Sequence, residues 1–282
     1  MKKMLASTAI LSLAGLTSAL AADIGSPPVV YPPVIEEPVY HAPEVHASSG
    51  WYLRGDAGYG WNRLRGITYS VSGGTNDFTT SKLKRSFSVG AGVGYQFNKR
   101  FRSDLTLDYI TNTKFTGSTV GSCGVGNPCT STDLASYTAW SLLANAYVDL
   151  FTYGRVTAYA GAGLGATYID WGDLRNTSCL TATPTTCDPT ITHAGAYGWR
   201  ATAALMAGAS IKITCGLAAD VNYRYRYMAG GRMFGYSTGG GPGFTKAIHT
   251  HEGRAGLRYS FGGCADTYIP PYEPPTLPPV YK

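Results

Sequence analysis

Charged side chains in this sequence recur at every second position of several segments, a spacing that places them on one face of a β-strand. Across residues 217–227, for example, ionic and amide residues alternate with Leu, Ala, Val and Tyr. Buried charges need partners, so such faces would have to meet and neutralise one another inside the molecule. We expect this internal ion network to consist of Arg54, Asp56, Arg102, Asp104, Asp108, Asp149, Arg200, Asp220, Arg224, Arg226, Glu252, Arg254 and Arg258.

Few residues suggest catalysis or cofactor binding. The sequence contains neither the HExxH pattern of zinc proteases nor a phosphate-binding loop. His249 and His251 flank Thr250 and could contact a metal or haem, but the simpler interpretation is a pair of polar residues near a loop. We therefore predict no enzyme activity, no catalytic residue, no metal site and no cofactor.

Six cysteines are the other reactive side chains, and in an exported chain they favour disulfides. Sequence alone allows about fifteen connectivities. Pairing within one loop joins Cys123 to Cys129 and, in a second loop, Cys179 to Cys187. A third bridge, from Cys215 to Cys264, is expected where two neighbouring strands end. Metal binding is the alternative, but the close Cys and His spacings of zinc sites are absent.

The ends of the chain differ from its middle. Residues 1–21 combine Lys2 and Lys3 with an apolar stretch and a small-residue cleavage site, which predicts a secretory signal peptide. Residues 22–49 and 264–282 are Pro-rich and are expected to form extended tails, because proline is excluded from central strands. Residues 50–263 then form one domain.

Eight segments of that domain alternate with period two. Their apolar faces carry no Lys, Arg, Asp or Glu and place aromatic residues toward the ends, as in strands that face lipid. A soluble β-barrel is the alternative. Short connections alternate with long ones at 62–84, 113–134, 171–195 and 230–246, which is typical of outer-membrane barrels. The expected strands are 51–61, 87–97, 102–110, 137–150, 156–168, 199–213, 217–227 and 252–261.

These observations predict an all-β fold, an eight-stranded antiparallel transmembrane β-barrel with Pro-rich tails in the periplasm. Barrels of this size have an interior that side chains can fill, so we expect a structural or surface protein with a filled, charge-paired lumen. Small-solute porin activity is the alternative, and a surface barrel that binds haem or another ligand, or an outer-membrane enzyme, are further ones. The net charge of +6 comes from scattered residues and does not predict nucleic-acid binding.

The segments WYLRGDAGY (51–59), YRYRY (223–227) and AGLRYSF (255–261) resemble the small outer-membrane β-barrel proteins of alphaproteobacteria, the porin family with an OmpA-like transmembrane domain. The resemblance covers residues 50–261. It implies a Gram-negative outer-membrane location and roles in envelope integrity, surface exposure, host interaction or haem binding. It also implies an assembly signal at Arg254, Gly256, Tyr259 and Phe261, although family barrels usually end at the phenylalanine.

The expected partners follow from this location. They are outer-membrane lipid and lipopolysaccharide, the barrel-assembly machinery, and peptidoglycan or a periplasmic protein that would bind the Pro-rich tails.

Overall fold

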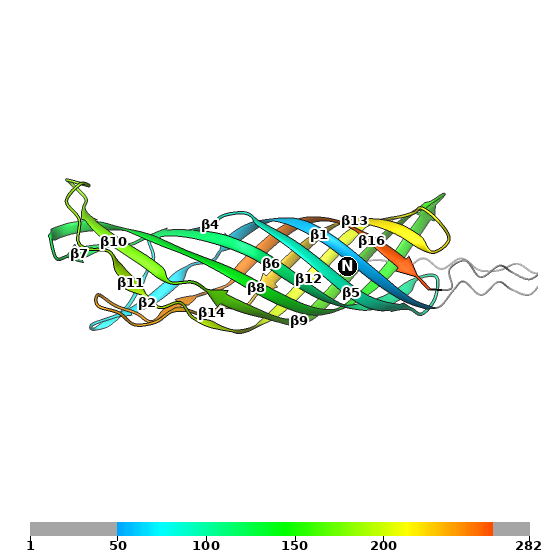
Figure 1. Ribbon diagram of the computed structural model, residues 1–282, viewed down its shortest axis with the longest axis horizontal. Coiled ribbons are helices and arrows are strands. Elements are labelled where there is room, and N and C mark those ends of the chain that lie inside the picture. Colours follow the sequence, from blue (N-terminus) through cyan, green and yellow to red (C-terminus); the bar gives the residue numbers. More distant parts are fainter. Residues whose placement is uncertain (1–49, 262–282) are drawn as a thin grey trace, which may run out of the picture. The chain divides into compact units, whose positions relative to one another are not determined.

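The computed structural model describes residues 50–261, most of which lie in β-strands (Figure 1). No helix in this part of the chain is long and apolar enough to cross a membrane. Eight long strands pair with their neighbours in antiparallel fashion, and the last of them pairs with the first, so that they close into a ring. In ring order they are β1 (Gly50–Leu64), β5 (Ser86–Gln96), β6 (Phe101–Ser118), β8 (Gly126–Tyr153), β9 (Val156–Trp171), β12 (Tyr197–Lys212), β13 (Leu217–Met228) and β16 (Ile248–Ser260).

The two ends of the ring differ. Short turns at 97–100, 154–155 and 213–216 lie at one end, together with residues 50 and 261, and we call this the short-turn end. At the opposite, long-loop end the chain forms further strands, which continue or cover the wall of the ring (Figure 1). They are β2 (Ile67–Val71), β3 (Gly74–Asp77), β4 (Thr80–Leu83), β7 (Val120–Cys123), β10 (Leu174–Leu180), β11 (Ile191–His193), β14 (Gly231–Phe234) and β15 (Gly243–Thr245).

All four long segments expected as loops therefore contain strands, and 62–84 and 113–134 consist mostly of them. Strand β6 extends to Ser118, and β8 already begins at Gly126, well inside the predicted loop 113–134. Strand β10 continues this surface by pairing with β8, for example Asn176 opposite Asp133. The Gly, Ser, Thr and Asn residues of these segments favour loops in the sequence. In the structure their backbone N–H and C=O groups form hydrogen bonds with the edges of neighbouring strands.

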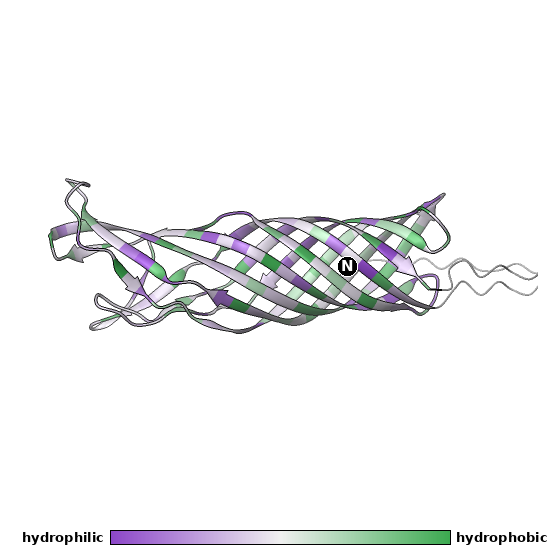
Figure 2. Ribbon diagram, viewed as in Figure 1, coloured by the Kyte–Doolittle hydropathy of each residue, from purple (hydrophilic) through white to green (hydrophobic). Residues whose placement is uncertain are grey.

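Burial alternates along the ring strands in the opposite sense to a water-soluble protein. On β1 the ionic Arg54 is 9% exposed, whereas its neighbour Leu53 is 48% exposed. Polar side chains thus face the interior and apolar side chains face outward, and this alternation is visible along the ribbons in Figure 2. The fold positions every predicted network residue on the inner face.

A β-bulge between Ile110 and Thr113 interrupts the pairing of β6 with β8. On the side of the bulge nearer the short-turn end, which we call its lower side, odd positions such as Leu107 and Tyr109 face outward. One extra residue reverses this alternation, so Phe115 above the bulge is buried and Lys114 is exposed. The bulge therefore determines which side chains of β6 face the interior in its upper part, between the bulge and the long-loop end.

Candidate functional site

The interior nearest the short-turn end holds two arginines that pack among polar and aromatic side chains. The guanidinium of Arg102 lies 4.8 Å from the ring centre of Tyr147 and 4.3 Å from that of Tyr159, with Asp149 at 3.3 Å. Arg258 pairs with Asp220 at 3.3 Å and donates to Ser210 Oγ at 2.8 Å. A planar guanidinium can stack on aromatic rings, so these arginines fill the cross-section as well as carrying charge.

The next layer is centred on Asp104. Arg54 Nη1 lies 2.9 Å from Asp104 Oδ2, and Asn145 Nδ2 donates to Asp104 Oδ1 at 2.8 Å. The same arginine donates to the Tyr147 hydroxyl at 2.9 Å and pairs with Asp56 at 3.1 Å. Three strands, β1, β6 and β8, are tied across the interior by these bonds, which satisfy a carboxylate that is 6% exposed.

Above this layer lies the densest part of the network. Arg224 contacts both Asp108 and Glu252 at 2.7 Å, and Arg226 contacts Glu252 at 2.8 Å. Arg254 reaches Asp108 at 2.7 Å and also pairs with Asp56, which joins this layer to the one below. Charges of opposite sign are thus interleaved, as buried ions require.

Arg200 is the exception among the predicted network residues. No ion pair within 4.0 Å links it to another residue of the 50–261 region, although it is only 5% exposed. Its guanidinium instead donates to Thr245 Oγ1 at 2.5 Å and to the Arg232 carbonyl oxygen at 2.7 Å. The prediction that carboxylates neutralise Arg200 is wrong: this side chain ties the β14–β15 hairpin to the wall of the ring.

Porin activity, the alternative function, would need open space in the interior, but the inward glycines of β5 and β9 do not provide it. A Cβ atom at Gly90 would overlap Asp108 Oδ1 and come within 3.1 Å of Arg254 Nη2. At Gly94 it would overlap the ring of Tyr52, and at Gly161 that of Tyr147. Long side chains from adjacent strands already occupy the space that each glycine makes.

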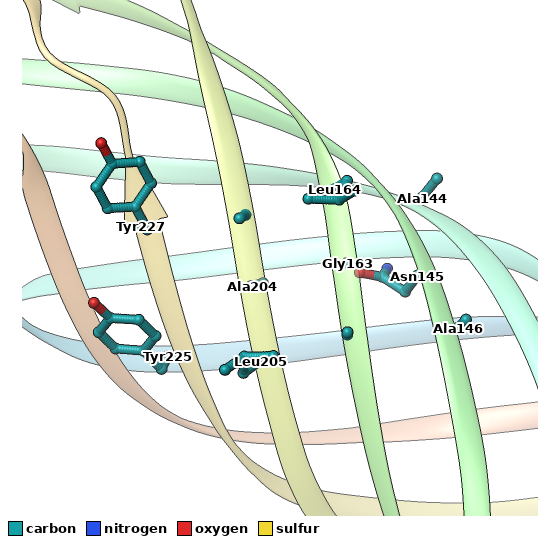
Figure 3. A pocket seen from close by; sticks show the side chains of 11 residues that line it. Ala144, Asn145, Ala146, Gly163, Leu164, Ala204, Leu205, Tyr225 and Tyr227 are labelled. Carbon is teal, nitrogen blue, oxygen red and sulfur yellow. The ribbon is translucent and has the colours of Figure 1, made fainter.

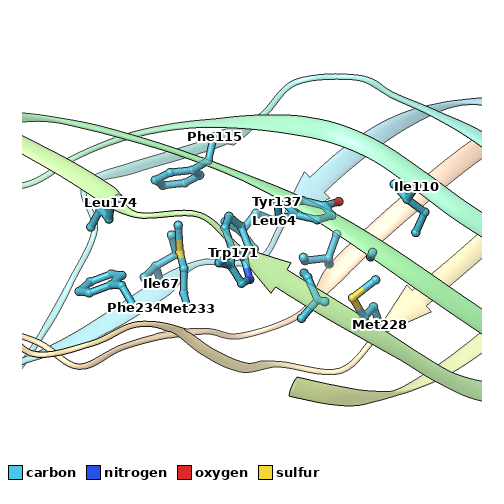
Figure 4. Packing of buried hydrophobic residues seen from close by; sticks show 13 residues of the cluster. Leu64, Ile67, Ile110, Phe115, Tyr137, Trp171, Leu174, Met228, Met233 and Phe234 are labelled. Carbon is cyan, nitrogen blue, oxygen red and sulfur yellow. The ribbon is translucent and has the colours of Figure 1, made fainter. Parts of the chain in front are cut away.

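Sequence reasoning missed an apolar cluster that lies beyond the ion network, toward the long-loop end (Figure 4). Trp171 packs against Tyr137, with ring centres 4.8 Å apart, and against Phe115 at 6.3 Å. We call this cluster the apolar plug. It consists of Leu64, Ile67, Ile110, Phe115, Tyr137, Ala139, Ile169, Trp171, Leu174, Met228, Met233, Phe234 and Ile248.

The signal for the apolar plug was the alternation itself, which continues past the expected strand ends. Ile169 and Trp171 follow the same inward parity as Thr167 on β9. Phe115 could not be found in this way, because the bulge in β6 reverses its direction. Met233 and Phe234 belong to β14, inside a segment expected to be a loop.

Cavities open at both ends of the interior. At the short-turn end about 440 Å³ is enclosed by residues that include Asp149, Lys212 and Arg258. At the long-loop end about 450 Å³ is enclosed by β2, β8, β10 and neighbouring segments, with Asp133 and His193 among the lining residues. The ion network and the apolar plug lie between these two cavities.

Aromatic residues gather at both ends of the outward apolar face. Trp51, Phe97 and Phe101 are about half exposed at the short-turn end. Trp61 and Trp140 mark the other limit, the latter with its ring centre 4.7 Å from that of Tyr109. From Trp51 to Trp61, β1 covers the ~9–11 residues that a tilted strand needs to cross a bilayer.

Between these limits the outward face is not uniform. Small side chains on β8, β9 and β12 form an apolar groove of about 710 Å³ (Figure 3). Leu164 and Leu205 rise from its floor, and Tyr225 and Tyr227 of β13 stand along one side.

The two histidines of β16 bond to tyrosines of β13. The Tyr225 hydroxyl lies 2.5 Å from His249 Nδ1, and the Tyr223 hydroxyl lies 2.6 Å from His251 Nδ1. Across residues 50–261, no group of three or more His, Cys, Asp or Glu side chains is arranged to hold a metal ion.

Disulfides join Cys123 to Cys129 and Cys179 to Cys187, both at the long-loop end. Cys215 is not a free thiol, and Cys264, its expected partner, lies outside the described residues. The predicted signal peptide (1–21) and the segments predicted to form Pro-rich tails (22–49 and 264–282) also lie outside them.

Of the four residues of the expected assembly signal, three lie on β16 and Phe261 follows directly after it. Arg254 is buried in the ion network, and a side chain at Gly256 would overlap Asp56. Tyr259 and Phe261 point outward, with ring centres 5.3 Å apart.

One enzyme-like pattern also falls at the long-loop end, where residues 235–239 read Gly-Tyr-Ser-Thr-Gly. In hydrolases this GxSxG spacing marks a turn from a strand into a helix. Here Ser237 instead forms reciprocal backbone hydrogen bonds with Gly240, at 3.0 and 3.1 Å, and β15 follows. The pattern therefore lacks the structural context of a nucleophile.

Comparison with known proteins agrees with this architecture. Residues 39–261 match the outer membrane protein beta-barrel domain family. An uncharacterized protein of Brucella abortus (strain 2308) is 36% identical in an alignment of 249 residues, and the match covers 76% of this chain and 86% of that protein. A Rickettsia canadensis (strain McKiel) protein named "Putative adhesin" is 31% identical over 177 residues, 61% of this chain and 65% of that protein.

Among solved structures, the outer membrane protein OprG from Pseudomonas aeruginosa aligns with a TM-score of 0.47 and 14% identity, covering 77% of this chain and 97% of that one. Neisserial surface protein A aligns with a TM-score of 0.39 and 20% identity, over 76% of this chain and 98% of the other. The match of the family domain to most of the sequence, together with the Brucella relative, shows that this chain belongs to the outer membrane β-barrel family and resides in the outer membrane of a Gram-negative bacterium.

Proposed function

We propose that this protein crosses the outer membrane as an eight-stranded β-barrel with a closed interior, and that it serves as a structural and surface-presenting protein and not as a pore. In this arrangement the short-turn end faces the periplasm and the long-loop end faces the exterior. The outward apolar face supports it. It lies between an inner aromatic band (Trp51, Phe97, Phe101) and an outer aromatic band (Trp61, Trp140). Between the two bands β1 provides the ~9–11 residues that a tilted strand needs to cross a bilayer.

The filled interior is the observation that carries the proposal. A solute entering from outside would meet the apolar plug, with Trp171, Phe115 and Ile169 each no more than 2% exposed. Below it, Arg224, Arg226, Asp108 and Glu252 occupy the bore and neutralise one another. Moving a hydrated ion past both regions would require apolar side chains and paired charges to separate.

The long-loop end supports the surface role. Strands β6, β8 and β10 continue beyond the outer aromatic band as one sheet, and the Cys123–Cys129 and Cys179–Cys187 disulfides fasten its hairpins. A rigid, crosslinked sheet outside the membrane suits contact with other molecules, and the name of the Rickettsia relative is consistent with such a role.

Planar-bilayer recording tests the closed interior. Refolded protein, verified by faster gel migration of the unboiled sample, should give no discrete conductance steps. A Trp171→Ala variant should also remain silent, because the ion network still fills the bore below it. Reproducible single-channel steps from the native chain would contradict the proposal and favour the porin alternative.

A further inference from the structure

Basic side chains gather on one side of the barrel just beyond the outer aromatic band. On β1, Arg63 is the next outward residue after Trp61 and lies opposite His249 of β16. Lys114 is exposed at the corresponding height of β6, where the bulge has turned it outward. We define the cationic belt as Arg63, Arg65, Lys84, Arg85, Lys114 and Lys246, none of which is buried.

Backbone hydrogen bonds hold these residues side by side although they come from distant parts of the sequence. Lys84 N donates to Lys114 O at 2.8 Å, and Asn62 Nδ2 donates to Lys84 O at 2.9 Å. On the other flank, Lys246 N donates to the Gly66 carbonyl oxygen at 2.9 Å. The belt therefore follows the wall continuously from β16 across β1 to β6.

Little negative charge on the protein balances this belt. Lys246 pairs with Asp77 at 3.6 Å, where both side chains are more than half exposed. The other five basic residues have no ion pair within 4.0 Å to any residue of the described barrel. At the same end, β9 and the segment after it present Asp170 and Asp173 to solvent, away from the belt.

We propose that the cationic belt binds the phosphate groups of lipid headgroups in the outer leaflet. This inference rests on the membrane orientation given under Proposed function. The belt's height carries it: Tyr59, Trp61 and Phe87 mark the boundary between hydrocarbon and headgroups, and the cations follow directly above them. Flexible Lys and Arg stems reach phosphate oxygens from this level, while their carbon chains stay against the apolar boundary. Free inorganic phosphate lacks the acyl chains that would hold it there.

Binding of lipid A to the folded chain in nonionic detergent micelles tests this proposal. The probes are lipid A with two phosphates, lipid A with its phosphates removed, and inorganic phosphate, each titrated calorimetrically. The variant R63Q/K84Q/K114Q removes three belt charges. Its matched control K99Q/R100Q/R155Q removes three exposed charges at the short-turn end.

We expect the native chain and the control to bind the phosphorylated lipid equally, and the belt variant to bind it at least about tenfold more weakly. Raising the salt concentration should weaken native binding. Dephosphorylated lipid should bind the native chain and the belt variant alike. Equal binding of phosphorylated lipid by all three proteins would overturn the proposal, and so would saturation of the belt by inorganic phosphate alone. Either result, with insertion and bilayer silence intact, would leave the closed-barrel function standing.

Discussion

Glu252 illustrates how much a single buried carboxylate can hold together. It is 1% exposed and accepts from Arg224 at 2.7 Å and from Arg226 at 2.8 Å. Both guanidiniums would remain in the interior if this partner were removed. Because an uncompensated buried charge is far more costly than a broken surface pair, the network should respond strongly to such a change.

We predict that Glu252→Ala lowers the free energy of unfolding by about 3–5 kcal/mol. Asp77→Ala, which breaks the exposed pair with Lys246, should lower it by less than about 1 kcal/mol. Urea unfolding in lipid vesicles, followed by tryptophan fluorescence, measures both. Similar losses for the two variants would show that the interior charges are not desolvated as the structure indicates.

Asp133 has a different role, in the sheet beyond the outer aromatic band. Burial raises the pKa of its carboxyl above the ordinary value, although hydrogen bonds from Ser131 Oγ at 2.5 Å and Asn176 Nδ2 at 2.6 Å act against this rise. The folded chain thus holds this proton more tightly than the unfolded chain. The stability from this group is fully present below the ordinary carboxyl pKa and is lost as the pH rises through the raised value.

Protease sensitivity of the β7–β8–β10 sheet should therefore increase as the pH rises across that interval. The variant Asp133→Asn carries no titrating group there and should show a flat profile. Cleavage rates measured at a series of pH values, with the barrel embedded in vesicles, provide the comparison. An identical pH profile for the two proteins would exclude Asp133 as the cause.

At the scale of elements, alternation along the strands predicts most of the wall but not its upper part. The inward and outward residues of β13 and β16 follow the sequence pattern throughout. On β6 the pattern fails above Ile110, because the bulge is a local backbone event with no clear mark in the residue types. The strands beyond the outer aromatic band were missed for a related reason: their Gly and Asn residues are poor strand formers, and pairing with neighbours stabilises them.

At several inward positions the strands require glycine, because a side chain there would overlap neighbouring atoms. Gly94 on β5 lies beneath Tyr52, whose hydroxyl donates to Asp104 at 3.2 Å. Gly253 on β16 faces outward, and a Cβ atom there would have no neighbouring atom within 4 Å. The two positions therefore differ in the space that a side chain would find.

We predict that Gly94→Val destabilises the barrel by about 1–3 kcal/mol or more, because Tyr52 must leave its position and release Asp104. Gly253→Val should change stability by less than about 0.5 kcal/mol. The fraction of heat-modifiable, folded protein across a urea series measures both effects. A tolerated Gly94→Val would mean that the layer around Tyr52 is loosely packed.

At the scale of the whole molecule, strict alternation and the order of short and long connections were sufficient to predict a ring of eight strands. They were not sufficient to predict what fills it. The interior ion pairs join residues on different strands, such as Arg254 and Asp108, and such pairing depends on the stagger of the ring, which no single segment encodes. The apolar plug depends on strands that the sequence presents as loops.

The reversal of the interior from ions to apolar side chains along the barrel axis has a consequence for substitutions. In the lower part, a leucine belongs outside and an arginine inside, as Leu53 and Arg54 show. In the upper part, Phe115 is inside and Lys114 outside. The same amino-acid exchange, on the same face of one strand, should therefore be tolerated at one position and disruptive a few residues further along. The change occurs at the height where the surroundings of the wall change from hydrocarbon to water. We therefore expect substitutions on the two sides of the outer aromatic band to follow opposite rules, with ionic side chains tolerated inside on one side and apolar side chains on the other.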